Sequence, residues 1–334
     1  MSPPVEGISR CHSAIACASG DTTEDTATDD TATNETTDDA ATTETEDTAD
    51  DTTEETSSES GSYVIGLMLS DMTNEFFSTL EASARETADA AGQTLISLTA
   101  TNDAAKDVSN MEDLLSQDPD IIIYNPVDSD AAPDVVAMAN EAGVPVITVD
   151  RASNGGEVLC HIASDNVYGG ELAGQYIVDA LGADGGEVVE IQGQAGASAT
   201  NDRGTGFHNI VDATDNVEVV VSQTGNWATA DAMTIMENAL TSNPDVKAVF
   251  CHNDTMALGA LEACTQAGRD DIIIVGFDAD AAAVAEIEAG VMAATIQQLP
   301  DEMGKTAVNT AIEYLNGTDI EAQIGVEVAL ISRD

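Results

Sequence analysis

The chain has 334 residues, of which 62 are Asp or Glu and only nine are Lys or Arg, so its formal net charge is −53. This balance argues against binding to nucleic acid or attraction to anionic lipid, because both need clustered positive charge. The length suggests two domains of about 150 residues each, and no run reaches the ~18 consecutive apolar residues that a membrane-spanning helix needs.

The first 20 residues contain a candidate export segment. SAIACASG resembles the lipobox of exported lipoproteins, with Cys17 as the lipid-carrying residue. However, MSPPVEGISRCH is neither basic enough nor apolar enough for a signal peptide. Either the true start lies elsewhere or the export signal is unconventional. The alternative is a plain disordered N-terminus in which Cys17 has no role.

Residues 21–62 form an acidic linker that is almost wholly Thr, Asp, Glu, Ala and Ser. We expect it to be disordered and extended, because it has no large apolar side chain to offset the entropy cost of ordering. Residues 1–62 hold only 17 of the 62 acidic residues, so the remainder of the chain is itself strongly anionic. This suits either a salt-rich habitat or an ordinary low-lysine exported protein.

From Tyr63 onward, apolar strand-like runs alternate with helical patterns. In residues 74–92, apolar positions at spacings of three and four (Phe77, Leu80, Ala84, Ala88 and Ala91) predict a helix with one buried face. Strand-like runs occur at residues 63–69, 94–100, 120–126 and 144–150, and the rhythm resumes at residues 186–193, 217–223, 246–254, 271–278 and 292–298. This alternation predicts two doubly wound α/β units with parallel sheets.

Polar side chains stand where the predicted strands end. In open parallel sheets, ligands bind outside the carboxyl ends of the strands. The strand-end residues are Ser70, Asn125, Asp150, Arg151, Asn253, Asp278 and Gln298. Asn253 and Asp278 have an alternative role as caps of the helices that follow them.

The charge of this set favours a neutral ligand rich in hydroxyl groups. Arg203, predicted to lie in the Gly-flanked loop 197–207, brings the set to two aspartates and two arginines, and no phosphate-binding Gly-rich loop is present. Paired Asp and Arg side chains form directional, charge-assisted hydrogen bonds. Phe76, Phe77 and the sole tryptophan, Trp227 in the loop after a strand, offer flat faces for a sugar ring, or else the phenylalanines are core residues and Trp227 is a surface aromatic.

At this point the sequence resembles the exported pentose- and hexose-binding proteins of ATP-binding-cassette (ABC) importers, most closely the ribose binders. The resemblance covers nearly all of residues 63–334. The matching motifs are SDMTNEFF, NPVDSDA, VPVITVDR, HIASDNVYGG, NDRGTGF, VFCHNDTMALGAL, VGFDAD and ATIQQLPDEMG. Carried over position by position, the sugar contacts fall on Ser70, Asn74, Phe76, Phe77, Asp150, Arg151, Arg203, Trp227, Asn253, Asp278 and Gln298.

The resemblance also implies an architecture of two lobes that close on the ligand about a three-segment hinge. The implied N-terminal lobe comprises residues 63–164 and 299–327, and the C-terminal lobe residues 165–298 and 328–334. The implied partners are a neutral monosaccharide, an ABC permease and a chemoreceptor, for a monomer that does not bind nucleic acid. The implied location is the periplasm or the cell surface, with lipid anchoring to the outer face of the cytoplasmic membrane through Cys17.

The identity of the sugar stays open between D-ribose and D-allose or another aldose. Asp150, Arg151 and Phe77 are of the ribose type, whereas Trp227 stands where ribose binders have Phe and is more like the allose binders. Glu75 also departs from the ribose pattern, which has Pro there.

The remaining alternative is a sugar-active enzyme in which Asp150 and Asp278 flank a glycosidic bond. Arg151 beside Asp150 argues against this, since it holds that carboxyl ionised. We expect no cofactor and no metal site, because the five cysteines show no CxxC or zinc-like spacing. Cys160, Cys251 and Cys264 are expected to be inert buried thiols.

Overall fold

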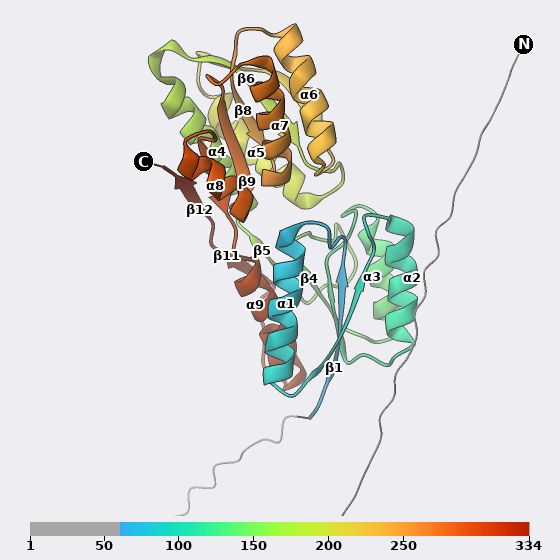
Figure 1. The fold of residues 1–334 in the computed structure, drawn as a ribbon. Coiled ribbons are helices and arrows are strands. Elements are labelled where there is room, and N and C mark those ends of the chain that lie inside the picture. The colour runs from blue at the N-terminus through green and yellow to red at the C-terminus, as the bar shows by residue number, and fades with distance from the viewer. Residues whose placement is uncertain (1–60, 334) are drawn as a thin grey trace, which may run out of the picture. The chain divides into compact units, whose positions relative to one another are not determined.

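The computed structural model describes residues 61–333 (Figure 1). Cys17, the candidate export segment and all but the last two residues of the acidic linker lie outside the described residues. Two six-stranded sheets, each flanked by helices, make up two α/β lobes. The prediction of two doubly wound lobes with parallel sheets is confirmed.

The first sheet has the strand order β11-β5-β4-β3-β1-β2, and all its pairings are parallel. Its lobe contains β1 (Val64–Leu69), α1 (Glu75–Ala90), β2 (Thr94–Thr99), α2 (Ala104–Leu115), β3 (Ile121–Tyr124), α3 (Ala132–Glu141), β4 (Val146–Val149), β5 (Cys160–Ser164), α9 (Pro300–Leu315) and β11 (Gln323–Val326). Helices α1 and α9 lie side by side on one face of this sheet (Figure 1).

The second sheet has the order β12-β10-β9-β8-β6-β7 and is parallel except for the antiparallel pairing of β10 with β12. Its lobe contains α4 (Asn166–Leu181), η1 (Gly182–Asp184), β6 (Gly186–Gln192), α5 (Ser198–Val211), β7 (Val217–Thr224), α6 (Thr229–Ser242), β8 (Val246–Cys251), α7 (Asp254–Ala267), β9 (Ile273–Asp278), α8 (Ala281–Ala289), β10 (Ala294–Gln297) and β12 (Ala329–Ser332).

The chain passes between the two sheets three times, from β5 to α4, from β10 to α9 and from β11 to β12. In the first sheet β1 lies between β2 and β3, and in the second sheet β6 lies between β7 and β8, so the strand order reverses at β1 and at β6. This places β1 beside β3, and β6 beside β8. Such switch points leave a crevice at the carboxyl ends of the two strands, where ligands bind in open α/β sheets.

Helix α1 shows how the sequence pattern becomes a core. Phe77, Leu80, Ala84 and Ala88 are buried against the first sheet, as the periodicity predicts. The prediction that Ala91 continues this face is wrong: the helix ends at Ala90, and Ala91 is exposed beyond it. Asn74 caps the helix by accepting a hydrogen bond from the Phe76 amide at 2.8 Å.

The predicted loop around Arg203 is instead a helix, α5. Its glycines looked like loop signals, but they allow close packing against α4. A Cβ at Gly206 would lie 1.9 Å from the Val167 carbonyl oxygen, and one at Gly170 would lie 2.2 Å from the Arg203 carbonyl oxygen. Both distances are far below a van der Waals contact, so only glycine fits at this crossing.

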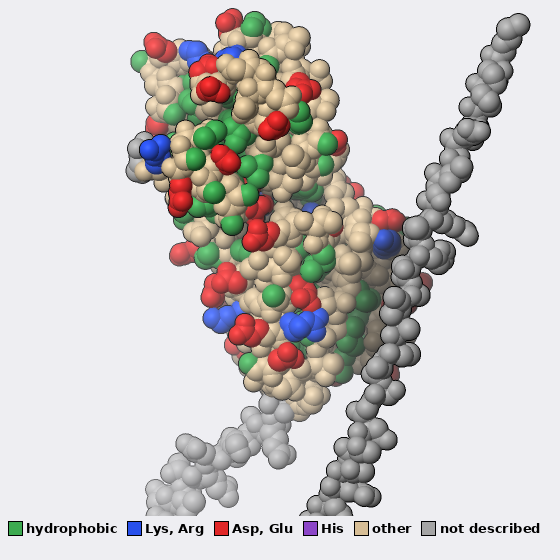
Figure 2. All heavy atoms as spheres, viewed as in Figure 1, with side chains coloured by type: hydrophobic (Ala, Val, Ile, Leu, Met, Phe, Trp, Pro, Cys, Tyr) green, Lys and Arg blue, Asp and Glu red, His purple; other side chains and the backbone are tan. Residues whose placement is uncertain are grey.

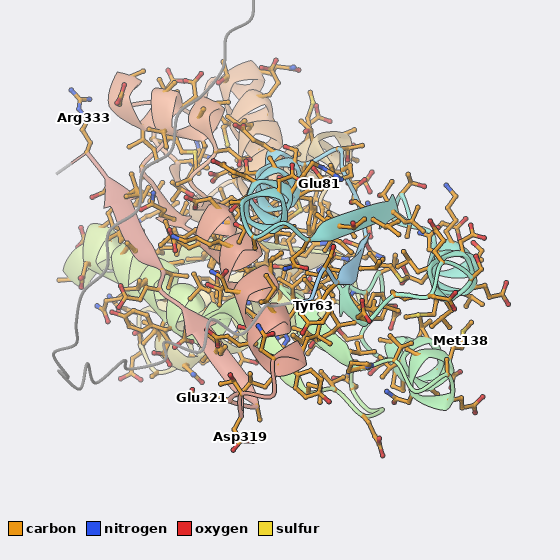
Figure 3. All side chains as sticks on the ribbon, turned by 90° about the horizontal axis from the view of Figure 1, so that it is seen from below. Tyr63, Glu81, Met138, Asp319, Glu321 and Arg333 are labelled. Carbon is orange, nitrogen blue, oxygen red and sulfur yellow. The ribbon has the colours of Figure 1, made fainter. Side chains whose placement is uncertain are left out.

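Within residues 61–333, no helix is both long enough and apolar enough to cross a membrane. Acidic side chains are spread over both lobes on the face drawn in Figure 2, where basic ones are few. The start of β1 is tied to the end of α9 by Tyr63, labelled in Figure 3, whose hydroxyl lies 3.0 Å from Asn316 Oδ1.

Candidate ligand-binding site

A cavity of about 310 Å³ is lined by residues from both lobes, at the small end of the range for small-molecule pockets. Its lining residues are Asp71, Thr73, Asn74, Phe76, Phe77, Asn102, Asp150, Arg151, Ala199, Arg203, Asn226, Trp227, Ala228, Asn253, Thr255, Asp278 and Gln298. Most of them follow the carboxyl end of a strand, where the topology places a ligand crevice.

The structure brings ten of the eleven sequence-predicted site residues to this cavity. The exception is Ser70, which is buried just outside it. Its backbone amide donates to Asn125 Oδ1 at 3.1 Å, and Asn125 Nδ2 in turn donates to Asp150 Oδ2 at 3.0 Å. Ser70 and Asn125 therefore support the cavity wall through Asp150 instead of lining it.

In the first lobe, Asp150 and Arg151 stand at the end of β4. Arg151 Nη1 donates to the backbone carbonyls of Pro126 and Val127 at 3.3 and 3.2 Å. Arg151 Nε lies 3.8 Å from Asp150 Oδ2, and both side chains are nearly inaccessible to solvent. Burial lowers the pKa of Arg151, which Asp150 partly offsets. The guanidinium is thus anchored through Nη1 to two backbone carbonyls, while Arg151 also lines the cavity.

In the second lobe, Arg203, Asp278 and Gln298 form a matching group. Arg203 Nη1 lies 3.7 Å from Asp278 Oδ1, and Gln298 Nε2 donates to the same oxygen at 2.6 Å. Arg203 Nε donates to Asn166 Oδ1 at 2.8 Å. Burial raises the pKa of Asp278 to about 7, although Arg203 and the Gln298 hydrogen bond favour its charged form.

The two residues with an alternative role as helix caps behave differently. Asn253 is the N-cap of α7, and its Oδ1 accepts from the Met256 amide at 3.0 Å, whereas its Nδ2 has no partner in the described protein. Asp278 is not a cap, because α8 begins after Asp280. The capping role therefore coexists with the cavity at Asn253 and is excluded for Asp278.

Aromatic residues from both lobes line the cavity. Phe76 and Phe77 belong to the core of the first lobe and also line the cavity. Trp227 lies in the loop between β7 and α6, where its indole rests on Gly193, since a Cβ there would lie 2.0 Å from the ring. The guanidinium carbon of Arg151 is 5.6 Å from the centroid of Phe77 and 5.9 Å from that of Trp227, so one cation lies near aromatic faces from both lobes.

Three buried polar atoms of lining residues have no hydrogen-bond partner in the described protein: Trp227 Nε1, Asn253 Nδ2 and Gln298 Oε1. A buried polar atom without a partner costs about 1–3 kcal/mol. Two of these atoms are donors and one is an acceptor. A ligand whose groups both donate and accept, as hydroxyls do, matches this combination of donors and acceptor.

Backbone strain is also concentrated here. Among the described residues, eight non-glycine residues have a positive φ, and five of them line the cavity. These five are Asn102, Asp150, Asn226, Trp227 and Asp278. Such conformations cost free energy and persist mostly where a functional arrangement requires them.

Sequence reasoning missed several lining residues. Asp71 and Thr73 follow Ser70 after β1, and Asn102 follows β2, so a broader search of the strand ends would have found them. Asn226 follows β7 in the same way, whereas Ala199, Ala228 and Thr255 carry no chemical signal of this kind. Asp71 adds a third carboxyl group to the two arginines, but the raised pKa of Asp278 leaves the group close to neutral near pH 7.

The comparison with known proteins agrees with this geometry. A family model described as a periplasmic binding protein domain matches residues 65–319. The chain belongs to the periplasmic binding protein family. Ribose import binding protein RbsB of Escherichia coli (strain K12) is 43% identical over 267 residues, covering 80% of this chain and 90% of that protein. The D-allose-binding periplasmic protein of the same organism is 32% identical over 210 residues, covering 60% and 68%.

Among solved structures, an ABC transporter solute-binding protein from Mycobacterium smegmatis with bound glycerol superposes with a TM-score of 0.79 at 32% identity. The superposition covers 82% of this chain and 95% of that protein. As a member of the periplasmic binding protein family, the chain is a substrate-binding protein and not an enzyme. The alternative in which Asp150 and Asp278 act as catalytic carboxylates is therefore set aside.

In residues 61–333 no group of three or more His, Cys, Asp and Glu side chains is arranged to hold a metal ion. Cys160, Cys251 and Cys264 are buried free thiols, as predicted. Burial raises the pKa of Cys160 and of Cys264 to about 11. These three cysteines are therefore unreactive thiols within the hydrophobic cores of the two lobes.

Proposed function

We propose that this chain is the extracytoplasmic substrate-binding protein of an ABC importer, and that it binds D-ribose between its two lobes. The observation that carries the proposal is the near-neutral cavity with unpartnered donors on Trp227 and Asn253 and an unpartnered acceptor on Gln298. A charged ligand would need an excess of opposite charge there. A monosaccharide supplies hydroxyls that donate and accept, and carries no charge of its own.

The eleven predicted sugar contacts are kept in this proposal, with Ser70 acting through Asn125. Arg151 and Arg203 would each donate to hydroxyls from a different lobe, and Phe77 and Trp227 would contact the ring. The aromatic surfaces suit the C–H faces of a sugar, while the carboxylates of Asp150 and Asp278 accept from its hydroxyls.

Closure of the lobes about the three chain crossings would trap the sugar, and the closed form would be recognised by the permease. Hydrogen bonds already join the lobes beside the cavity: the Ser129 amide donates to the Gly196 carbonyl at 2.9 Å, and the Ala152 amide donates to Ser198 Oγ at 2.9 Å. A ligand that contacts both lobes favours this closed form by its differential affinity for it. The proposal places the protein outside the cytoplasmic membrane as a monomer, with Cys17 as its lipid anchor and with a chemoreceptor as a further partner of the closed form.

D-allose is the second candidate. Trp227 favours it, because a larger flat surface matches a larger sugar, and the D-allose-binding periplasmic protein is 32% identical to this chain. A binding panel separates the two sugars.

The test uses Trp227, the sole tryptophan, as the reporter. Ribose, allose, arabinose, myo-inositol and glucose are titrated separately while the indole emission is followed, and the sugar is then recovered and checked for chemical change. We expect saturable binding that is tightest for ribose, with the sugar unaltered. Tighter binding of allose would select the second candidate, and no response to any sugar in calorimetry would refute the proposal.

A further inference from the structure

Glu190, in the middle of β6, is a fully buried carboxyl group that does not line the cavity. Its Oε1 accepts a hydrogen bond from His252 Nε2 at 3.0 Å. Its Oε2 accepts from Gln192 Nε2 at 3.1 Å and from the Ser222 hydroxyl. His208 Nε2 lies 3.3 Å from the same oxygen. Four side chains thus converge on one buried carboxylate.

The ionisation of this cluster is well defined. Burial opposes the charge of Glu190, but the hydrogen bonds from His252 and Ser222 lower its pKa to about 2. Burial lowers the pKa of His252, so its imidazole is neutral. Because a carboxylate only accepts, the His252 hydrogen lies on Nε2, and the ring has one fixed orientation.

His252 connects this carboxylate to Arg203. The backbone carbonyl of His252 accepts a hydrogen bond from Arg203 Nη1. The next residue of the arginine's helix, Gly204, faces the same pair, since a Cβ there would lie 3.3 Å from Glu190 Oε1 and 3.5 Å from His252 Cε1. The Glu190–His252 pair therefore contacts α5 at Gly204 and fixes the residue whose carbonyl holds the guanidinium.

The other lobe repeats this construction behind Arg151. Asp107 on α2 is buried and does not line the cavity. Its Oδ2 accepts from the Val127 amide at 3.0 Å and from the Tyr124 hydroxyl at 2.9 Å. The carbonyl of the same Val127 accepts from Arg151 Nη1 at 3.2 Å. In both lobes a buried acid binds the residue whose carbonyl holds a cavity arginine.

We propose that Glu190 and Asp107 are positioning residues that fix the guanidinium groups of Arg203 and Arg151 for sugar binding, acting through His252 and Val127. This role rests on the proposed sugar-binding function. A purely structural acid would lower stability without depending on the arginine, whereas a positioning acid affects affinity only while the arginine is there to be positioned.

The test is a double-mutant cycle on ribose affinity, measured by calorimetry. We expect Glu190→Gln to weaken binding about tenfold, the effect of losing one charge-assisted hydrogen bond. In an Arg203→Lys background, Glu190→Gln should weaken binding by less than about threefold, because lysine has no planar guanidinium group whose orientation Glu190 could fix. Asp107→Asn with Arg151→Lys forms the second cycle. The control is Glu187→Gln on the same strand, which should leave the affinity within about twofold.

Equal weakening by Glu190→Gln in both backgrounds would overturn the positioning role. Unchanged affinity after Glu190→Gln in the protein that retains Arg203 would also overturn it. If Glu190→Gln does not fold, the Asp107 cycle decides by the same criterion. A wild-type protein that binds no sugar would instead refute the proposed function, so the two failures are distinguishable.

Discussion

Asp278→Asn probes the most perturbed carboxyl group of the cavity without changing its shape. Asn accepts the hydrogen bond from Gln298 as Asp does, and its side chain has the same branching as that of Asp, so the substitution adds no strain at the positive φ of 124°. The substitution therefore mimics protonated Asp278. Its effect on sugar affinity should depend on pH in a way that the structure predicts.

The magnitude follows from two opposing contributions. At 3.7 Å and an effective dielectric constant of about 20, the attraction between Arg203 and Asp278 is worth about 4 kcal/mol. Burial outweighs it, because a pKa raised from 3.8 to about 7 means that ionisation costs about 4 kcal/mol more in the folded protein than in the unfolded chain. Asp278 is therefore mostly protonated at pH 5.5 and mostly ionised at pH 8.5.

We expect Asp278→Asn to weaken ribose binding about 10- to 100-fold at pH 8.5, the range for a hydroxyl that donates to a charged acceptor. At pH 5.5 the wild-type and variant affinities should agree within about threefold. Calorimetric titration at both pH values measures the ratio. Asp280, with a pKa of about 6, titrates in both proteins and does not distinguish them. The same weakening at both pH values would show that the charge of Asp278 has no part in binding.

The raised pKa of Asp278 also predicts how the stability of the sugar-free protein depends on pH. Between pH 7 and about 4 the folded protein holds a proton on Asp278 that the unfolded chain has released. Stability from this group therefore rises as the pH falls from 7 toward 4. Chemical denaturation should show a steeper rise over this range in the wild type than in Asp278→Asn, and parallel curves would contradict the raised pKa.

Three further predictions concern neighbouring features. Gly193→Ala places a methyl group where the Trp227 indole lies, so we expect a shifted emission maximum and at least tenfold weaker sugar binding; unchanged emission would be contrary to this contact. Burial opposes the charge of His208, but hydrogen bonds to Asp212 and Glu190 raise its pKa, so its contribution to stability is complete below pH 6.5 and is lost as the pH rises through the raised value. Denaturation curves should show that His208→Gln destabilises more at pH 5.5 than at pH 8.5, and an equal effect would count against the pairing. Burial raises the pKa of Asp280 in the second lobe to about 6, and the charge of Glu75 in the first lobe contributes to the rise. Glu75→Gln should therefore tighten ribose binding a few-fold at pH 8 at low salt, and weaker or unchanged binding would argue against repulsion between these two carboxylates.

The strand ends could be predicted from the sequence because a parallel sheet fixes where its strands terminate. Asp150, Asn253 and Gln298 needed no knowledge of packing, since each lies one or two residues after the last apolar residue of a strand-like run. Arg203 was found by its chemistry, but its secondary structure was predicted wrongly. Glycine is a common loop residue, and only the close approach of α4 shows why Gly206 belongs in a helix.

Supporting residues could not be predicted in the same way. Glu190 is a charged residue within an apolar strand, and its partners His252 and Ser222 are distant in sequence, so nothing in the local pattern indicates that they meet. Ser70 shows the opposite limit. It satisfies the strand-end rule, but it is buried outside the cavity, where its backbone amide donates to Asn125 Oδ1 and its hydroxyl has no partner in the described protein, and the strand-end rule does not give this burial.

The two halves of the site solve one physical problem in the same way. Each arginine must keep N–H groups free for a ligand without being left unpaired in a buried wall, and each is held by a backbone carbonyl and a neighbouring carboxylate. The unpartnered atoms of Trp227, Asn253 and Gln298 then act as a filter, since a sugar that lacks a matching hydroxyl leaves at least one of them unsatisfied at about 1–3 kcal/mol each. Discrimination between ribose and its deoxy analogues should therefore come from the cost of unmade hydrogen bonds more than from the fit of the ring between Phe77 and Trp227.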